Sequence, residues 1–104
     1  MSQYNLIISD EFSADFETIL ADKKAYGTYE SNIAIFEEEI NKRLIKLTTS
    51  PKSGANLNAR VRIETAIKYF VIDDYLMFFE IISETEVEVI RLLPARTDWN
   101  SKLF

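Results

Sequence analysis

The C-terminal part of the chain holds two long apolar runs, a pair of aspartates between them, and a third run after a polar break. Nearly every residue is apolar or aromatic from Ala66 to Ile72 and from Tyr75 to Ile82, and the third run begins at Val87. Runs rich in β-branched and aromatic residues are typical of strands. Asp73 and Asp74 supply turn geometry between the first two runs. This segment therefore predicts a three-stranded antiparallel meander.

The N-terminal part predicts a strand followed by a helix. The apolar run from Tyr4 to Ile8 suits a short strand, and Ser9 or Asp10 is a suitable N-cap for the helix after it. Apolar residues then recur at helical spacing, namely Phe12, Phe16, Ile19 and Leu20. Gly27 marks the break before a second helix.

A longer amphipathic stripe predicts that second helix from about Tyr29 to Leu47. Its apolar positions step by three and four residues, at Ile33, Phe36, Ile40, Leu44 and Leu47, and Ile35 and Ile45 widen the stripe. Glu38 with Lys42, and Glu39 with Arg43, have the spacing of helical ion pairs. The helix should end before Pro51, because a residue that precedes proline is disfavoured in the α region. A loop from Ser50 to Asn58 should follow.

These elements predict an α+β fold with two helices on one face of a four-stranded sheet. Neither face of the strand at 75–82 is polar, because apolar residues occupy both alternating sets of positions. Two explanations remain open. Either the C-terminal segment with Trp99, Leu103 and Phe104 folds over the second face, or a partner protein covers it.

Composition limits the class of protein. The chain has 104 residues, 47% of them hydrophobic and 28% charged, which indicates one ordered domain over residues 1–104. No apolar run has the roughly 20 residues that a membrane-spanning helix needs, and the first residues do not resemble a secretory signal. We therefore expect a cytoplasmic protein without a membrane partner.

The chain has no histidine and no cysteine, so Ser-His and Cys-His nucleophilic catalysis is excluded. The adjacent residues Glu37, Glu38 and Glu39 diverge around a helix and cannot converge on one ion. We expect no metal site and no cofactor. The net charge of −5 disfavours a broad nucleic-acid surface. A local basic patch for a phosphate or a target remains a hypothesis, with these candidates: Arg60, Arg62, Lys68, Arg91 and Arg96.

The segment YLMFFEI followed by VEVIRLLPARTDW, together with the order of elements, resembles the RelE/ParE superfamily of toxins from type II toxin-antitoxin systems. The resemblance implies a small toxin that inhibits growth when free and is neutralised by its cognate antitoxin. ParE-like members inhibit DNA gyrase, whereas RelE-like members cleave messenger RNA on the ribosome. A non-toxic binding module with the same fold is a third possibility.

The resemblance also suggests site residues. Arg96 matches the position of an arginine that stabilises phosphate charge in RelE-like nucleases, so it is the candidate catalytic residue. Leu76 replaces a second arginine of that pattern, and Pro94 stands where many relatives have a histidine. These differences favour gyrase over messenger RNA as the target. Alternatively, Arg96 forms a surface ion pair with Asp98 or a helix carboxylate.

The antitoxin would lay an amphipathic helix across the helical hairpin or the sheet, or would add a strand to an edge. The surplus of apolar strand residues and the aromatic tail suggest its contacts: Phe78, Ile82, Trp99 and Leu103.

Overall fold

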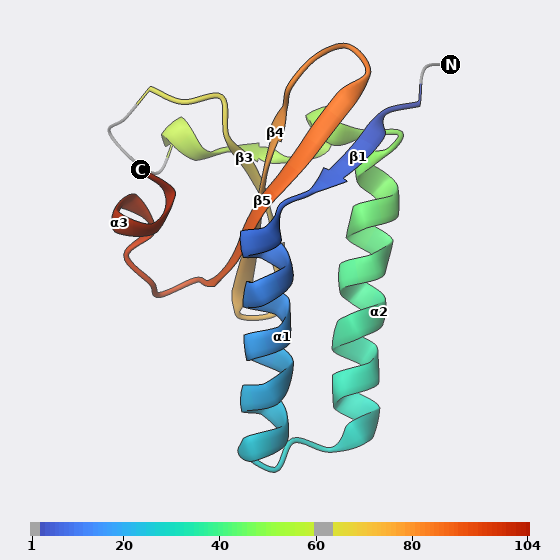
Figure 1. Cartoon of the computed structure of the whole chain (residues 1–104), viewed down its shortest axis with the longest axis vertical. Coiled ribbons are helices and arrows are strands. Elements are labelled where there is room, and N and C mark those ends of the chain that lie inside the picture. The colour runs from blue at the N-terminus through green and yellow to red at the C-terminus, as the bar shows by residue number, and fades with distance from the viewer. Residues whose placement is uncertain (1–2, 60–63) are drawn as a thin grey trace.

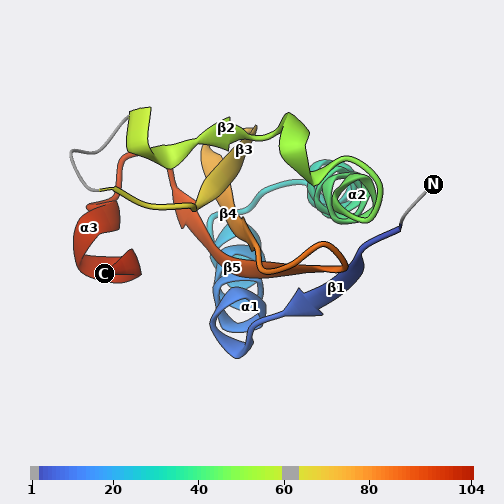
Figure 2. The same ribbon diagram turned by 90° about the horizontal axis from the view of Figure 1, so that it is seen from above.

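The computed structural model describes residues 3–59 and 64–104, and it shows one five-stranded sheet with helices against both faces (Figures 1 and 2). The helices are α1 (Asp10–Ala25), α2 (Glu30–Leu47) and α3 (Trp99–Leu103). The strands are β1 (Asn5–Ile8), β2 (Ala55–Asn56), β3 (Lys68–Ile72), β4 (Tyr75–Ile81) and β5 (Glu86–Pro94). Two of the predicted basic contacts, Arg60 and Arg62, lie outside the described residues.

The strand order is β1-β5-β4-β3-β2, with β1 parallel to β5 and every other neighbouring pair antiparallel. The predicted strand, helical hairpin and meander are confirmed. Asp73 occupies the turn between β3 and β4 with a positive φ of 54°, a conformation that Asp tolerates better than most residues. The sequence did not predict β2, which adds a fifth strand within the expected loop at Ser50 to Asn58.

Ser9 joins β1 to α1 and ties both to β5. Its hydroxyl accepts a hydrogen bond from the backbone N–H of Phe12 at 3.0 Å, which is the expected N-cap interaction. The same hydroxyl donates to the carbonyl of Ile90 at 2.6 Å, and the backbone N–H of Ser9 donates to Val89. The start of α1 is therefore fixed against the edge of β5.

The two long helices cover one face of the sheet, as predicted. The buried residues of this layer come from both helices and from three strands, and they include Phe12, Ile19, Phe36, Ile40, Leu47, Phe70, Met77, Phe79, Val87 and Leu92. On the outer side of α2, Lys42 pairs with both Glu38 and Glu39 at 3.6 Å. The predicted pair of Glu39 with Arg43 is absent, because the Arg43 guanidinium lies over the ring of Phe70.

The other face of the sheet carries a second, smaller apolar cluster. Leu57, Ile67, Leu76, Phe78 and Leu93 are buried there. Trp99 and Leu103 of α3 pack on this cluster, and the Trp99 ring meets that of Phe78 edge-on at 6.0 Å. The C-terminal segment thus covers the second face. Phe104 does not contribute, since its side chain is exposed.

Gly54 is required because its neighbours leave no room for a side chain. A Cβ atom at Gly54 would lie 2.8 Å from Cε1 of the buried Phe79 ring and closer still to Cζ. The φ of Gly54 is −72°, which any residue can adopt, so space is the constraint and backbone strain is not. Overpacking a filled core typically costs 1–3 kcal/mol.

Gly54→Ala is therefore expected to lower the free energy of unfolding by about 1–2 kcal/mol, measured by urea denaturation. The double variant Gly54→Ala/Phe79→Leu serves as the control, because the smaller side chain makes room for the methyl group. The double variant should lose less stability than the sum of the two single variants. Strict additivity would show that the methyl group does not meet the ring.

Candidate functional site

Arg96, the candidate catalytic residue, lies in the exposed turn after β5. It lines a hollow of about 360 Å³ with Asp74, Pro94 and Ala95. The predicted ion pair with Asp98 or a helix carboxylate is absent, and Arg96 bonds to no side chain in the described part of the chain. The hollow brings one guanidinium and one carboxylate together. Cleavage of a phosphodiester also needs an acid for the leaving group, and no histidine, lysine or tyrosine is among the described residues that line it.

Arg91 is held by a carboxylate of α1. Its Nε and Nη2 atoms donate to the two oxygens of Asp15 at 2.7 and 2.8 Å, and Nη1 donates to the carbonyl of Lys102 at 3.3 Å. The hydrogen bond to Asp15 raises the pKa of Arg91 further above its ordinary value, so the group stays cationic. In the pairing of β5 with β4, Arg91 lies opposite Phe78 and Val89 lies opposite Phe79, so Ile90 is left without a partner as a β-bulge. This bulge sets the position of Arg91 on β5.

Of the remaining candidate cations, Lys68 is the one that the structure describes. The Lys68 ammonium donates to the side chain of Asn56 at 2.7 Å and to the carbonyl of Gly54 at 3.4 Å, so it fastens β2 to β3. Arg91 and Arg96 line two separate hollows, and Lys68 is not among the described residues that line either of them. The basic patch stays a prediction, because two of its five candidate residues, Arg60 and Arg62, lie outside the described residues.

The nuclease positions inferred from the resemblance are equally unsuited to phosphate. Leu76 is buried in the cluster beneath α3, and Pro94 ends β5 opposite Tyr75. Tyr75 is partly buried, and burial raises its pKa, with smaller contributions from the nearby charges of Asp73 and Asp74. The phenol therefore stays protonated near neutral pH and is a hydrogen-bond donor, not a base.

The residues predicted to contact an antitoxin divide into two groups. Phe78 is fully buried and lies beneath Trp99 and Leu103, so a direct contact with a partner is incompatible with this arrangement. The Trp99 side chain is also held in place, since its Nε1 donates a hydrogen bond to the carbonyl of Pro94 at 3.3 Å. Ile82, at the end of the β4–β5 hairpin, is 49% exposed. It is the one member of the set whose side chain is largely open to solvent.

One hollow of the structure was not predicted from the sequence. A groove of about 570 Å³ runs between α2 and the end of β3. Its walls include Ile35 of α2 and Val71 of β3, which are 57% and 56% exposed although both are apolar. Ile35 lies beside the main apolar stripe of its helix. This position was the signal in the sequence that α2 has apolar surface outside its buried stripe.

Cations over aromatic rings border the same groove. The Lys23 ammonium lies 4.6 Å from the centre of the Phe36 ring and 3.8 Å from a carboxylate oxygen of Asp73. Further along α2, Arg43 and Lys46 lie 5.2 and 6.0 Å from the centre of the Phe70 ring. Such contacts hold a cation near apolar surface. The groove thus combines apolar side chains with two cations, Lys23 and Arg43, and two carboxylates, Glu39 and Asp73.

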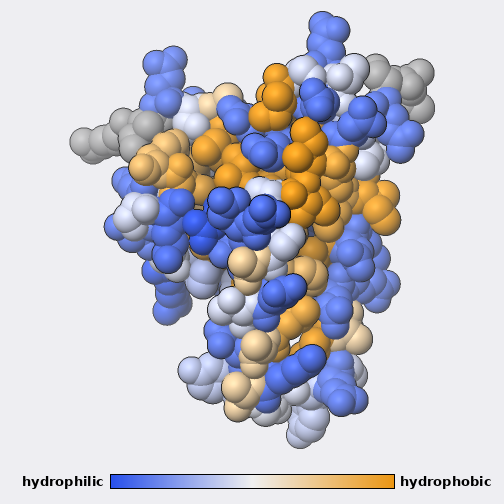
Figure 3. All heavy atoms as spheres, viewed as in Figure 1, coloured by the Kyte–Doolittle hydropathy of each residue, from blue (hydrophilic) through white to orange (hydrophobic). Residues whose placement is uncertain are grey.

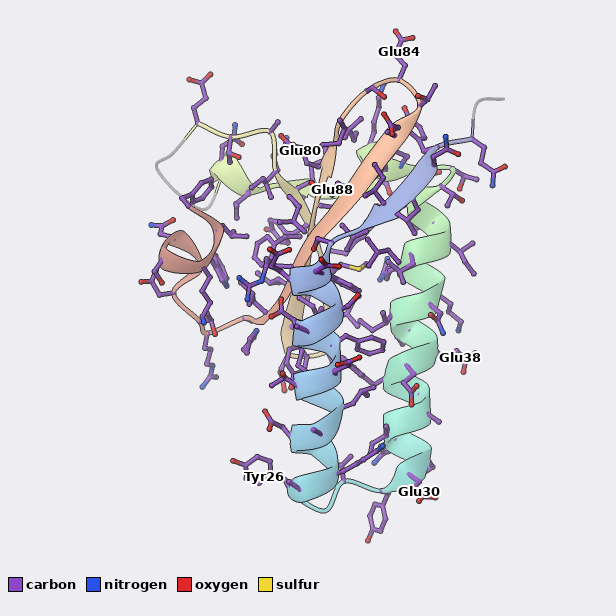
Figure 4. All side chains as sticks on the ribbon, in the orientation of Figure 1. Tyr26, Glu30, Glu38, Glu80, Glu84 and Glu88 are labelled. Atoms are coloured by element: carbon purple, nitrogen blue, oxygen red, sulfur yellow. The ribbon has the colours of Figure 1, made fainter. Side chains whose placement is uncertain are left out.

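The sheet exposes apolar side chains at its opposite edge as well. Figure 3 shows hydrophobic side chains gathered in the upper half of the view, where β1 and β5 lie, and Ile7 and Ile8 of β1 are both exposed. The end of the β4–β5 hairpin is acidic, with Glu80, Glu84 and Glu88 around it (Figure 4). Glu80 and Glu88 stand opposite each other in the strand pairing. Like charges so placed repel phosphate and also each other.

Within residues 3–59 and 64–104, no group of three or more potential ligand side chains is placed to hold a metal ion. No helix in the described part of the chain is long and apolar enough to cross a membrane.

Comparisons with known proteins agree with the fold. The family model described as the ParE toxin of the type II toxin-antitoxin system parDE matches residues 6–99. A solved structure described as the chromosomal ParDE TA system from P. aeruginosa superposes with a TM-score of 0.69 at 13% sequence identity. The match covers 88% of this chain and 96% of that chain, and at this identity it supports the fold alone. No curated protein matches the chain.

Proposed function

Because the chain belongs to the family of ParE toxins of type II toxin-antitoxin systems, we propose that it inhibits growth when free and is neutralised by a cognate antitoxin. The antitoxin occupies the groove between α2 and β3. The observation that carries this proposal is the groove itself, where Ile35 and Val71 remain exposed at the walls of a 570 Å³ hollow. Exposed apolar surface at a concave site is typical of protein recognition.

The proposed target is DNA gyrase in the cytoplasm. Messenger-RNA cleavage is disfavoured because the described residues that line the hollow of Arg96 include no second cation. Leu76 is buried where the nuclease pattern has an arginine. The acidic end of the β4–β5 hairpin would also repel a nucleic acid, whereas contact with a protein target needs no concentrated positive field.

Expression of the chain alone from a tightly controlled promoter tests this function. We expect growth to stop, with DNA synthesis failing before protein synthesis in the same culture. Coexpression of the product of the neighbouring gene should restore growth. The variant Arg96→Ala, which changes an exposed residue, should still arrest growth because a gyrase inhibitor needs no phosphate-stabilising arginine.

The other outcomes discriminate between the alternatives. If protein synthesis fails first and Arg96→Ala abolishes the arrest, the chain is a messenger-RNA nuclease. If growth is undisturbed although the chain accumulates in folded form, the toxin fold serves as a binding module without toxicity.

A further inference from the structure

The outer edge of β3 is only partly covered. β2 pairs with β3 at two positions, Asn56 with Lys68 and Ala55 with Tyr69. Within the described part of the chain, no strand pairs with Phe70–Ile72 on that side. An uncovered strand edge presents backbone N–H and C=O groups that can pair with another chain.

The register shows which backbone groups face outward. The N–H of Leu57, which follows β2, donates to the carbonyl of Ile67, so the backbone groups of Ile67 point away from β4. In an antiparallel sheet this direction alternates along the strand. Tyr69, paired with Ala55, and then Val71 therefore point their backbone groups the same way. The N–H and C=O of Val71 consequently face outward beyond the end of β2, where Val71 lines the groove.

Two basic residues, Lys23 and Arg43, and two acidic residues line the groove, but they differ in whether they are paired. Its two acidic residues already have partners, since Glu39 pairs with Lys42 at 3.6 Å and Asp73 pairs with Lys23 at 3.8 Å. In contrast, Arg43 and the neighbouring Lys46 have no carboxylate within 4.0 Å among the described residues. Both lie beside Phe70, the first residue of β3 beyond the reach of β2.

We propose that the antitoxin enters this groove as an extended segment that pairs with the backbone of Val71 and sets an acidic side chain against Arg43 and Lys46. This inference rests on the proposed function. Backbone pairing continues the sheet where β2 stops, and alternate side chains of the added strand reach Ile35 on the α2 side. The occupant is thus an extended acidic-apolar segment; an amphipathic helix in the groove would leave the edge of β3 unpaired.

Val71→Pro tests the pairing directly. Proline removes an N–H that does not bond to β4, and proline is tolerated on an edge strand when its N–H side faces solvent. We expect the variant to bind the purified product of the neighbouring gene at least about tenfold more weakly than the wild type, because one hydrogen bond is lost and the ring obstructs its neighbours. Val71→Thr, which keeps the N–H, should bind within about twofold of the wild type.

A proline on the opposite edge of the sheet is the matched control. The N–H groups of Asn5 and Ser9 donate to Thr85 and Val89, so by alternation the N–H of Ile8 points away from β5. Ile8→Pro should therefore leave antitoxin binding unchanged. If Val71→Pro binds as tightly as Val71→Thr, the proposal is overturned. If the wild type itself does not bind, the proposed function and this inference both fail.

Hydrogen exchange of the wild-type complex removes any dependence on how the proline variant folds. The amide of Val71 should exchange rapidly in the free chain and become protected in the complex. New protection of other amides along the groove, with a Val71 amide that still exchanges rapidly, would show that the antitoxin binds there without pairing with β3 and would overturn the proposal. Arg43→Glu/Lys46→Glu should weaken binding about tenfold or more, whereas Lys102→Glu on the opposite face should not.

Discussion

Replacing Phe78 by Ala should lower the free energy of unfolding by about 3–5 kcal/mol, the usual cost of deleting a buried phenylalanine ring. Phe78 is fully buried at the centre of the cluster beneath α3. Its ring centre lies 6.0 Å from that of Trp99 and 6.3 Å from that of Tyr69, so truncation leaves a cavity with aromatic walls. Urea denaturation followed by the fluorescence of the single tryptophan measures the effect and reports on the cavity wall itself.

Ile82→Ala is the control for this prediction. Ile82 comes from the same apolar segment and was an equally good candidate for an antitoxin contact, yet it is half exposed. Its truncation should change the free energy of unfolding by about 0.5 kcal/mol or less. A Phe78→Ala variant with wild-type stability and weakened antitoxin binding would contradict the structure, since it would mean that Phe78 is a surface residue.

The difference between Phe78 and Ile82 shows what local pattern can and cannot predict. The stripe of Ile33, Phe36 and Ile40 predicted α2 correctly, because a helix with one apolar side is defined by its own spacing. Strand alternation showed that both faces of β4 are apolar, and the structure places Phe78 on the face away from the long helices. The sequence could not predict what covers that face. The helix that covers it, α3, has five residues, which are too few to show an apolar stripe.

The candidate site was less predictable for the same reason. A groove needs two elements at a definite separation, and Ile35 and Val71 come from α2 and β3 without any shared local pattern. The basic patch is hard to judge from sequence, because a sequence shows the number of cations but not their partners. Lys68 is bound to Asn56, and Arg91 to a residue 76 positions earlier in the chain. Arg96 lies in an exposed turn after the last strand, and its catalytic role stays a prediction.

Asp15, the partner of Arg91, is the basis of the second prediction of a large loss of stability. Its carboxylate takes the place of a neighbouring strand at the edge of β5. β1 pairs with β5 only as far as Val89, and beyond that point the Asp15 carboxylate accepts the backbone N–H of Leu92 at 3.0 Å. The same carboxylate accepts two hydrogen bonds from Arg91. The side chains of Asp15 and Arg91 are only 14% and 21% exposed, so solvent cannot fully replace either interaction.

Asp15→Ala is therefore expected to lower the free energy of unfolding by about 2–3 kcal/mol, since it leaves a half-buried cation and a backbone donor without their acceptor. Asp15→Asn retains an oxygen for the N–H of Leu92 but loses the charge, and it should recover part of the loss. In a double-mutant cycle with Arg91→Ala, the coupling energy should account for most of the effect of Asp15→Ala. A coupling energy near zero would show that the Arg91 guanidinium is not held by α1 and is available to a target, which is the role that the sequence suggested for it.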